Sequence, residues 1–114
     1  MESVQVVEFV ARGSSRDVAR AIEQFAQQHG HVSAIVVPWE GTATTLSMSV
    51  TSVRADGWAI EHTNLGTITL TDLGNGRTAV AVAGEEPEHA ERDRLAAVFN
   101  RFALQLHRHF QAGS

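Results

Sequence analysis

The 114-residue sequence contains no cysteine, no lysine and no tyrosine. Without cysteine it has no disulfide bond, no thiolate nucleophile and no cysteine-ligated zinc or iron–sulfur centre. Without lysine it can neither form a Schiff base with a carbonyl substrate nor supply the lysine of a phosphate-binding P-loop. The lack of tyrosine removes the phenol that many small oxidoreductases and isomerases use as an acid. Several common kinds of active site are therefore excluded before any motif is considered.

Positive charge is also scarce. All nine basic residues are arginines, against thirteen Asp and Glu, so the formal net charge is −4 and the sequence pI is about 5.8. Nucleic-acid binding normally requires a clustered basic surface, and these arginines are scattered along the chain. The sequence therefore predicts no nucleic-acid partner.

Long apolar runs are missing as well. No run approaches the roughly 18 residues that a membrane-spanning helix needs. The N-terminal stretch MESVQVVEFVARG lacks the basic region followed by a long apolar core that marks a signal peptide. We expect no membrane span and a cytoplasmic location. With 43 % hydrophobic and 19 % charged residues, the balance is that of one soluble globular domain covering residues 1–114.

What the sequence does contain is a regular succession of strand and helix patterns. Strands are expected over residues 4–11, 32–38, 42–53, 58–63 and the two arms of 66–84, and helices over 16–28 and 87–110. Ser14 with Asp17 forms a Ser-x-x-acid helix start, and Ser15 is an equally good candidate for the cap. A turn is expected at residues 64–66, before the last hairpin.

This order of elements predicts an α+β fold. The five later strands are joined by short turns, which favours an antiparallel sheet. The sheet is expected to have about six strands, in the order β-α-β-β-β-β-β-α. Each later strand has one apolar face and the last helix has one apolar stripe, so the sheet should curve around the C-terminal helix.

The segment GTITLTDLGNGRTAVAVAG, residues 66–84, is predicted to be a β-hairpin. A two-residue loop would place Leu70 opposite Ala81, whereas a three-residue loop, residues 74–76, places it opposite Val80. We favour the second register, because it gathers the large apolar side chains on one face. The other face then carries small residues, either solvated or packed on a neighbouring subunit: Thr67, Thr69, Thr71, Ala79, Ala81 and Ala83.

Three stretches of the chain carry a resemblance to a known superfamily. They are VVEFVARGSSRDVARAI (6–22), GTITLTDLGNGRTAVAVA (66–83) and LAAVFNRFALQLHRHF (95–110). A strand leading into a Ser-capped helix, a late hairpin and a long C-terminal helix resemble the START/Bet v 1-like superfamily (SRPBCC, helix-grip; polyketide cyclase/lipid-transport type). The resemblance implies a short, divergent member whose sheet grips the last helix, with a lipid- or polyketide-like ligand.

An apolar set on the strands and the last helix has two interpretations, a plain core or the wall of a ligand pocket. In the second, Trp39 and Trp58 are aromatic platforms and His62 is a polar anchor. Met48 supplies adaptable surface for a flexible apolar ligand. The candidate ligand-binding residues are Trp39, Met48, Val50, Trp58, Ile60, His62, Ile68, Leu70, Phe99, Phe102 and Leu106.

The six histidines do not form a metal-binding pattern. In a helix, His107 and His109 would point about 200° apart and could not chelate one ion. His29 and His31 lack an evident third ligand. We therefore predict solvated histidines at both places, and no metal or cofactor. No nucleophile elbow, zinc-protease motif or phosphate loop is present, so no catalytic residue is assigned.

Three functions remain open. The leading hypothesis is a small soluble binding protein for a hydrophobic small molecule, held between the sheet and the C-terminal helix. The second is a cyclase- or dehydratase-like enzyme in the same pocket, with His62 as its general base. The third is a ligand-free interaction module, such as a homodimer, that uses the Thr/Ala face or an unpaired strand edge. The first two hypotheses require a pocket between the sheet and the helix, whereas the third does not.

Overall fold

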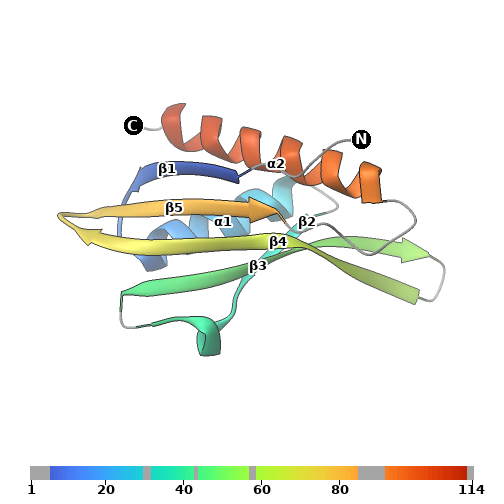
Figure 1. The fold of residues 1–114 in the computed structure, drawn as a ribbon, viewed down its shortest axis with the longest axis horizontal. Helices are drawn as coiled ribbons and strands as arrows, with labels where there is room; N and C mark the ends of the chain where they lie inside the picture. The colour runs from blue at the N-terminus through green and yellow to red at the C-terminus, as the bar shows by residue number, and fades with distance from the viewer. Residues whose placement is uncertain (1–5, 30–31, 43, 57–58, 85–91, 113–114) are drawn as a thin grey trace.

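The strands and helices follow one another along the chain in nearly the order that the sequence pattern indicates (Figure 1). The computed structural model describes residues 6–29, 32–42, 44–56, 59–84 and 92–112. In chain order the elements are β1 (Val6–Arg12), α1 (Ser15–His29), β2 (Val32–Val36), the short 3-10 helix η1 (Pro38–Glu40), β3 (Thr45–Asp56), β4 (Ala59–Gly74), β5 (Arg77–Gly84) and α2 (Arg92–Ala112).

The strands form one sheet in the order β1-β5-β4-β3-β2, and all neighbours are antiparallel. The last strand therefore lies beside the first, and β1 and β2 are the two edges. The predicted α+β class and the antiparallel, curved sheet are confirmed. The described residues form five strands rather than about six, because one of the expected turns does not occur.

The difference lies in β4. Asn64 and Gly66 are typical turn residues, which is why the sequence predicts a turn there. In the structure the strand continues, and its pairing with β3 shifts by one residue: Val50 is opposite Gly66, but Thr51 is opposite Asn64. Leu65 is thus the extra residue of a β-bulge, which bends a strand and increases its twist. Beyond the bulge, β3 and β4 continue together past the end of β5 (Figure 1).

Gly66 also marks the place where α2 approaches the sheet. A Cβ atom at this position would meet the carbonyl oxygen of Ala83, and it would lie 2.9 Å from both the Cα of Gly84 and the Cζ of Phe99. Carbon atoms in favourable contact are about 3.5–4.0 Å apart. The Phe99 ring therefore occupies space that only a glycine leaves open, which explains a glycine inside a strand.

The hairpin between β4 and β5 has the favoured register, since Leu70 is opposite Val80. The loop itself is shorter than predicted. Only Asn75 and Gly76 lie between the paired residues, with φ angles of 57° and 70°, and a type I′ turn requires two such positive angles. Leu73 is an extra residue of β4, and this bulge restores the register that a third loop residue was expected to give.

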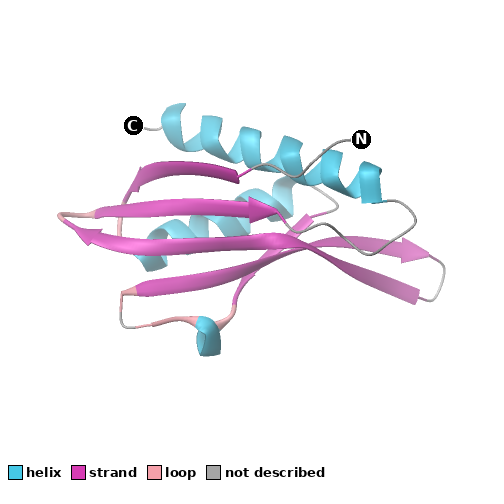
Figure 2. Ribbon diagram, in the orientation of Figure 1, coloured by secondary structure: helices cyan, strands magenta, loops and turns pink. Residues whose placement is uncertain are grey.

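The two helices cover one face of the sheet. The Ser14 hydroxyl accepts a hydrogen bond of 3.2 Å from the Asp17 N–H, so Ser14, rather than Ser15, is the cap of α1. Helix α1 packs mainly against β2, and α2 packs against β1 and also contacts β4 and β5. In Figure 2, α2 runs along the β1 side of the sheet and α1 lies behind the strands. Neither α-helix in the described part of the chain has the length and apolarity to cross a membrane.

The core lies between these helices and the covered face of the sheet. Its largest fully buried side chains are Phe99, Phe102, Ile22, Met48, Leu65, Ile68, Leu70, Leu106, Val18, Val50, Val80 and Val82. On the opposite face Thr69 is exposed, and Val10 and Ile35 are 57 % and 56 % exposed. The strands thus alternate between buried and solvent-facing residues, as an antiparallel sheet with one covered face does.

The connection between β1 and α1 is fastened to the start of β5. Thr78 is the buried polar side chain of the described core, and its hydroxyl donates a 2.9 Å hydrogen bond to the Gly13 carbonyl. The Gly13 N–H in turn donates to the Gly76 carbonyl at 2.6 Å. Gly13 has a φ of 118°, a conformation that favours glycine. These bonds fix where α1 begins relative to the sheet.

We expect Gly66→Ala to lower the free energy of unfolding by about 3 kcal/mol, because the new methyl group must displace Phe99 or the neighbouring backbone. Gly74→Ala is the matched control, since it meets no atom within 4 Å but places an alanine at a φ of +74°. That strain alone costs about 1 kcal/mol. Chemical denaturation of the two variants measures the difference. A Gly66→Ala protein as stable as Gly74→Ala would contradict the close packing of Phe99 on this strand.

Candidate functional site

Seven of the eleven candidate residues belong to the core between the sheet and the two helices. Strands β3 and β4 contribute four of them, and α2 contributes three. Each is 0 % exposed, so the space among them is filled by the side chains themselves: Met48, Val50, Ile68, Leu70, Phe99, Phe102 and Leu106. This part of the predicted wall is therefore closely packed core.

The other four candidates are not joined to this cluster. Trp39 lies on η1 and is 83 % exposed. Trp58 lies outside the described residues. Ile60 and His62 belong to β4, where their backbones pair with Ala55 and Val53, but their side chains lie outside the described part of the structure. Their membership of a binding site stays a prediction.

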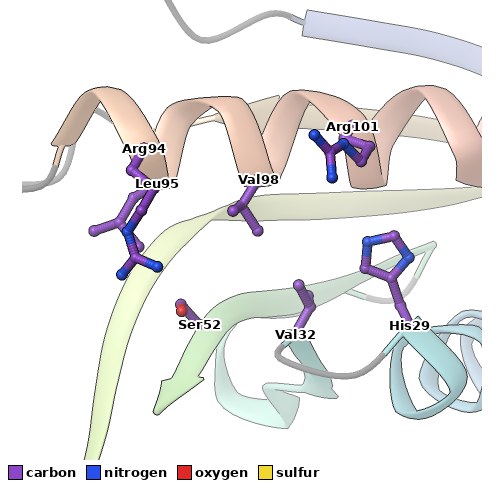
Figure 3. A pocket seen from close by; sticks show the side chains of 7 residues that line it. All are labelled: His29, Val32, Ser52, Arg94, Leu95, Val98 and Arg101. Atoms are coloured by element: carbon purple, nitrogen blue, oxygen red, sulfur yellow. The ribbon is translucent and has the colours of Figure 1, made fainter.

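A cavity of about 180 Å³ lies beside the filled part of the core, between the sheet and α2 (Figure 3). It is lined by His29, Val32, Ser52, Arg94, Leu95, Val98 and Arg101. A cavity of about 150 Å³ is enough to hold benzene in another protein. The space therefore suits a molecule of one ring or a short acyl chain.

Segments far apart in the sequence build the two sides of this cavity. Helix α1 ends at His29, and β2 begins at Val32, directly after the connection. Val32 is opposite Ser52 in the pairing of β2 with β3, so both lie at the same level of the sheet. In Figure 3, His29 points from the end of α1 towards α2. The floor of the cavity is thus the junction of α1, β2 and β3.

Helix α2 forms the roof. Arg94, Val98 and Arg101 are spaced i, i+4 and i+7, which places them on one side of the helix. Leu95 is buried next to them, Val98 is half-buried, and both arginines are exposed. Val98 points from α2 towards the strands, and Arg94 reaches down on the side of Ser52 (Figure 3). The roof therefore presents an apolar centre with a guanidinium group on either side.

The polar side chains around the apolar centre are all able to donate hydrogen bonds. Two guanidinium groups, one imidazole and one hydroxyl line the cavity. No Asp or Glu is among the described lining residues. Because guanidinium groups stay protonated in proteins, the lining carries positive charge even though the whole chain has a net charge of −4.

Stacked rings hold the His29 side of the cavity in place. The His29 ring lies 6.1 Å from that of Phe25 and 5.5 Å from that of Phe102. Phe25 also packs on His109, at 5.0 Å. Aromatic pairs at such distances each contribute about 0.5–1.5 kcal/mol beyond their buried area. The C-terminal halves of α1 and α2 are therefore joined by alternating phenylalanine and histidine rings.

The prediction of solvated histidines needs correction for two of them. His29 is half-buried by the rings just described. His107 is also half-buried, and its ring stacks on Phe9 of β1 with the centroids 5.0 Å apart. His109 is exposed, as expected, although its ring packs against that of Phe25. Helix-end position alone did not reveal that these rings would meet phenylalanines from other elements.

None of the eleven candidate residues is among the described lining residues of this cavity, so sequence reasoning missed all seven of them. Leu95 and Val98 belong to the apolar stripe of the last helix, but nothing local marked them as different from the buried Phe99. The arginines carried a weak signal, because Arg94 and Arg101 flank Val98 at helical spacing. Ser52 lies on a strand whose alternation gave no indication of a cavity above it.

The opposite face of the sheet offers a second concave surface. A groove of about 410 Å³ follows β1, β5 and β4. Its lining includes the small residues that the hairpin register predicted for this face, namely Thr69, Thr71, Ala79 and Ala81, together with Glu8, Phe9, Val10 and Val80. Apart from Glu8 this described lining is uncharged.

No protein-family model matches the chain, and the search of the curated proteins gave no match either. The geometry of the site is therefore the basis on which a function can be assigned.

The core and the cavity lining should respond differently to truncation. We expect Phe102→Ala to lower the free energy of unfolding by about 3–5 kcal/mol, because it removes a fully buried ring. Val98→Ala should cost only about 1 kcal/mol, since Val98 already borders an open space. Denaturation by urea provides both values. Equal losses would mean that Val98 is packed as tightly as Phe102 and that the cavity closes in solution.

Proposed function

We propose that this protein binds a small hydrophobic molecule between its sheet and the C-terminal helix. The observation that carries this proposal is a contrast along α2. Phe99, Phe102 and Leu106 are fully buried against the strands, whereas the neighbouring Leu95 and Val98 border a cavity of about 180 Å³. A ligand would extend the apolar interface at the place where side chains leave it unfilled.

The size of the cavity limits the affinity that apolar contact can supply. Burial contributes about 25 cal/mol per Å² of apolar surface, and association costs at least several kcal/mol in lost freedom of motion. A ligand of about ten heavy atoms is then held in roughly the micromolar to millimolar range. Polar contacts at the rim would have to provide further affinity and the orientation of the ligand.

The resemblance to the START/Bet v 1-like superfamily supports the same function. It implies a curved antiparallel sheet around a long C-terminal helix, with lipid- or polyketide-like ligands between them. The sheet order and the position of α2 agree with that arrangement. We include in the proposal the cytoplasmic location and the lack of a nucleic-acid partner that the sequence predicts.

The alternative is a homodimer joined through the outer face of the sheet. The exposed Val10 and Ile35 on that face favour it, because apolar side chains among small residues suit sheet-to-sheet packing. A catalytic alternative would depend on His62, whose side chain lies outside the described residues.

Native mass spectrometry of protein purified gently from its own host tests the proposal. We expect a mass excess that disappears on denaturation and that is absent from Val98→Trp, whose larger side chain fills the cavity. Leu104→Trp is the control, because Leu104 is on the same helix but is 44 % exposed and does not line the cavity. A clean mass at twice the chain weight would instead support the homodimer. A mass excess that survives in Val98→Trp would place the ligand elsewhere.

A further inference from the structure

We propose that the ligand of this cavity is an anion, a carboxylate on a short apolar body, and that the guanidinium group of Arg101 takes part in selecting the charge. This inference rests on the proposed function, since it names the class of molecule that the same cavity takes. It follows from the donors that line the cavity, from the charge around them and from the position of the apolar residues.

The lining supplies hydrogen-bond donors in excess. Arg94 and Arg101 carry guanidinium groups that can only donate, and His29 and Ser52 can each donate as well. A neutral apolar molecule would form no hydrogen bond with the Arg101 guanidinium, and a cationic one would be repelled by it. A carboxylate has two oxygens that match the paired N–H groups of a guanidinium in a bidentate contact.

The positive charge of the lining is local. The chain as a whole carries −4, so long-range attraction cannot draw an anion to it. Charges separated by more than about 8 Å are largely screened at physiological ionic strength. Arg101, exposed at a cavity with no acidic residue among its described lining, therefore offers a cationic group to a molecule bound there.

The apolar residues define the rest of the ligand. Val32 and Leu95 are buried and Val98 is half-buried, so the apolar surface lies deeper than the exposed guanidinium groups of Arg94 and Arg101. A molecule with an apolar end and a carboxylate end would place the first against the valines and leucine and the second at the rim. This is the polarity of a short fatty acid or an aromatic acid.

NMR titrations of the 114-residue chain with octanoate and with 1-octanol separate the contribution of the ligand's charge to binding from that of its apolar contact. We expect octanoate to bind about tenfold more tightly than 1-octanol, because a hydrogen bond to a charged group is worth more than a neutral one. The preference should shrink as salt is added, since the arginines are exposed.

Arg101→Gln and Arg108→Gln form a matched pair of variants. Both residues are exposed on α2, and each substitution removes one positive charge, but only Arg101 lines the cavity. Arg101→Gln should weaken octanoate binding about tenfold and leave 1-octanol binding unchanged. Arg108→Gln should change neither. Because both side chains are exposed, both variants are expected to fold.

Each outcome has a distinct meaning. Equal binding of octanoate and 1-octanol by the unmodified protein would overturn the anion inference while supporting a hydrophobic cavity. Binding of neither probe would count against the proposed function, and the inference would fall with it. Equal loss of octanoate binding in Arg101→Gln and Arg108→Gln would reduce the effect to overall charge and overturn the role of Arg101.

Discussion

The close contact between Phe99 and the sheet at Gly66 fixes the position of α2, and much of the structure depends on it. A side chain at Gly66 would occupy the space of the Phe99 ring, so the helix could not approach the strands as it does. The bulge at Leu65 turns two consecutive residues of β4 to the covered face, where both are buried. The extra residue Leu65 therefore bends the strand, and Gly66 next to it leaves the space into which Phe99 of α2 packs.

This contact divides α2 into two parts with different surroundings. On its C-terminal side, Phe102 and Leu106 complete a tightly packed core, and the edge contact between the rings of His29 and Phe102 joins the helix to α1. On its N-terminal side, Leu95 and Val98 border the cavity. The largest fully buried side chains that α2 adds to the core thus begin at Phe99 and lie towards its C-terminus. The N-terminal part of α2 can border a cavity while the core beside it stays packed. A small domain can thus contain both a packed core and a cavity.

The two faces of the sheet present different surfaces. The covered face holds the core and the arginine-rimmed cavity, whereas the outer face presents small residues and the exposed Val10 and Ile35. Because strand residues outside the two bulges of β4 alternate between these faces, a substitution on one face leaves the side chains of the other in place. The cavity under one face and the small-residue surface of the other can therefore be altered independently by substitution.

The sequence by itself determined the elements whose causes are local. Alternation in steps of two indicated the strands and favoured the Leu70–Val80 register. The sequence also narrowed the cap of α1 to Ser14 or Ser15, and the hydrogen bond from Asp17 identifies Ser14. The sequence could not show that Asn64 and Gly66 serve a bulge, because turns and bulges use the same residue types and only packing against Phe99 distinguishes them. The cavity was decided by tertiary structure alone. Its lining comes from four segments of the chain, and no local periodicity records which distant side chains will meet or where they will leave space between them.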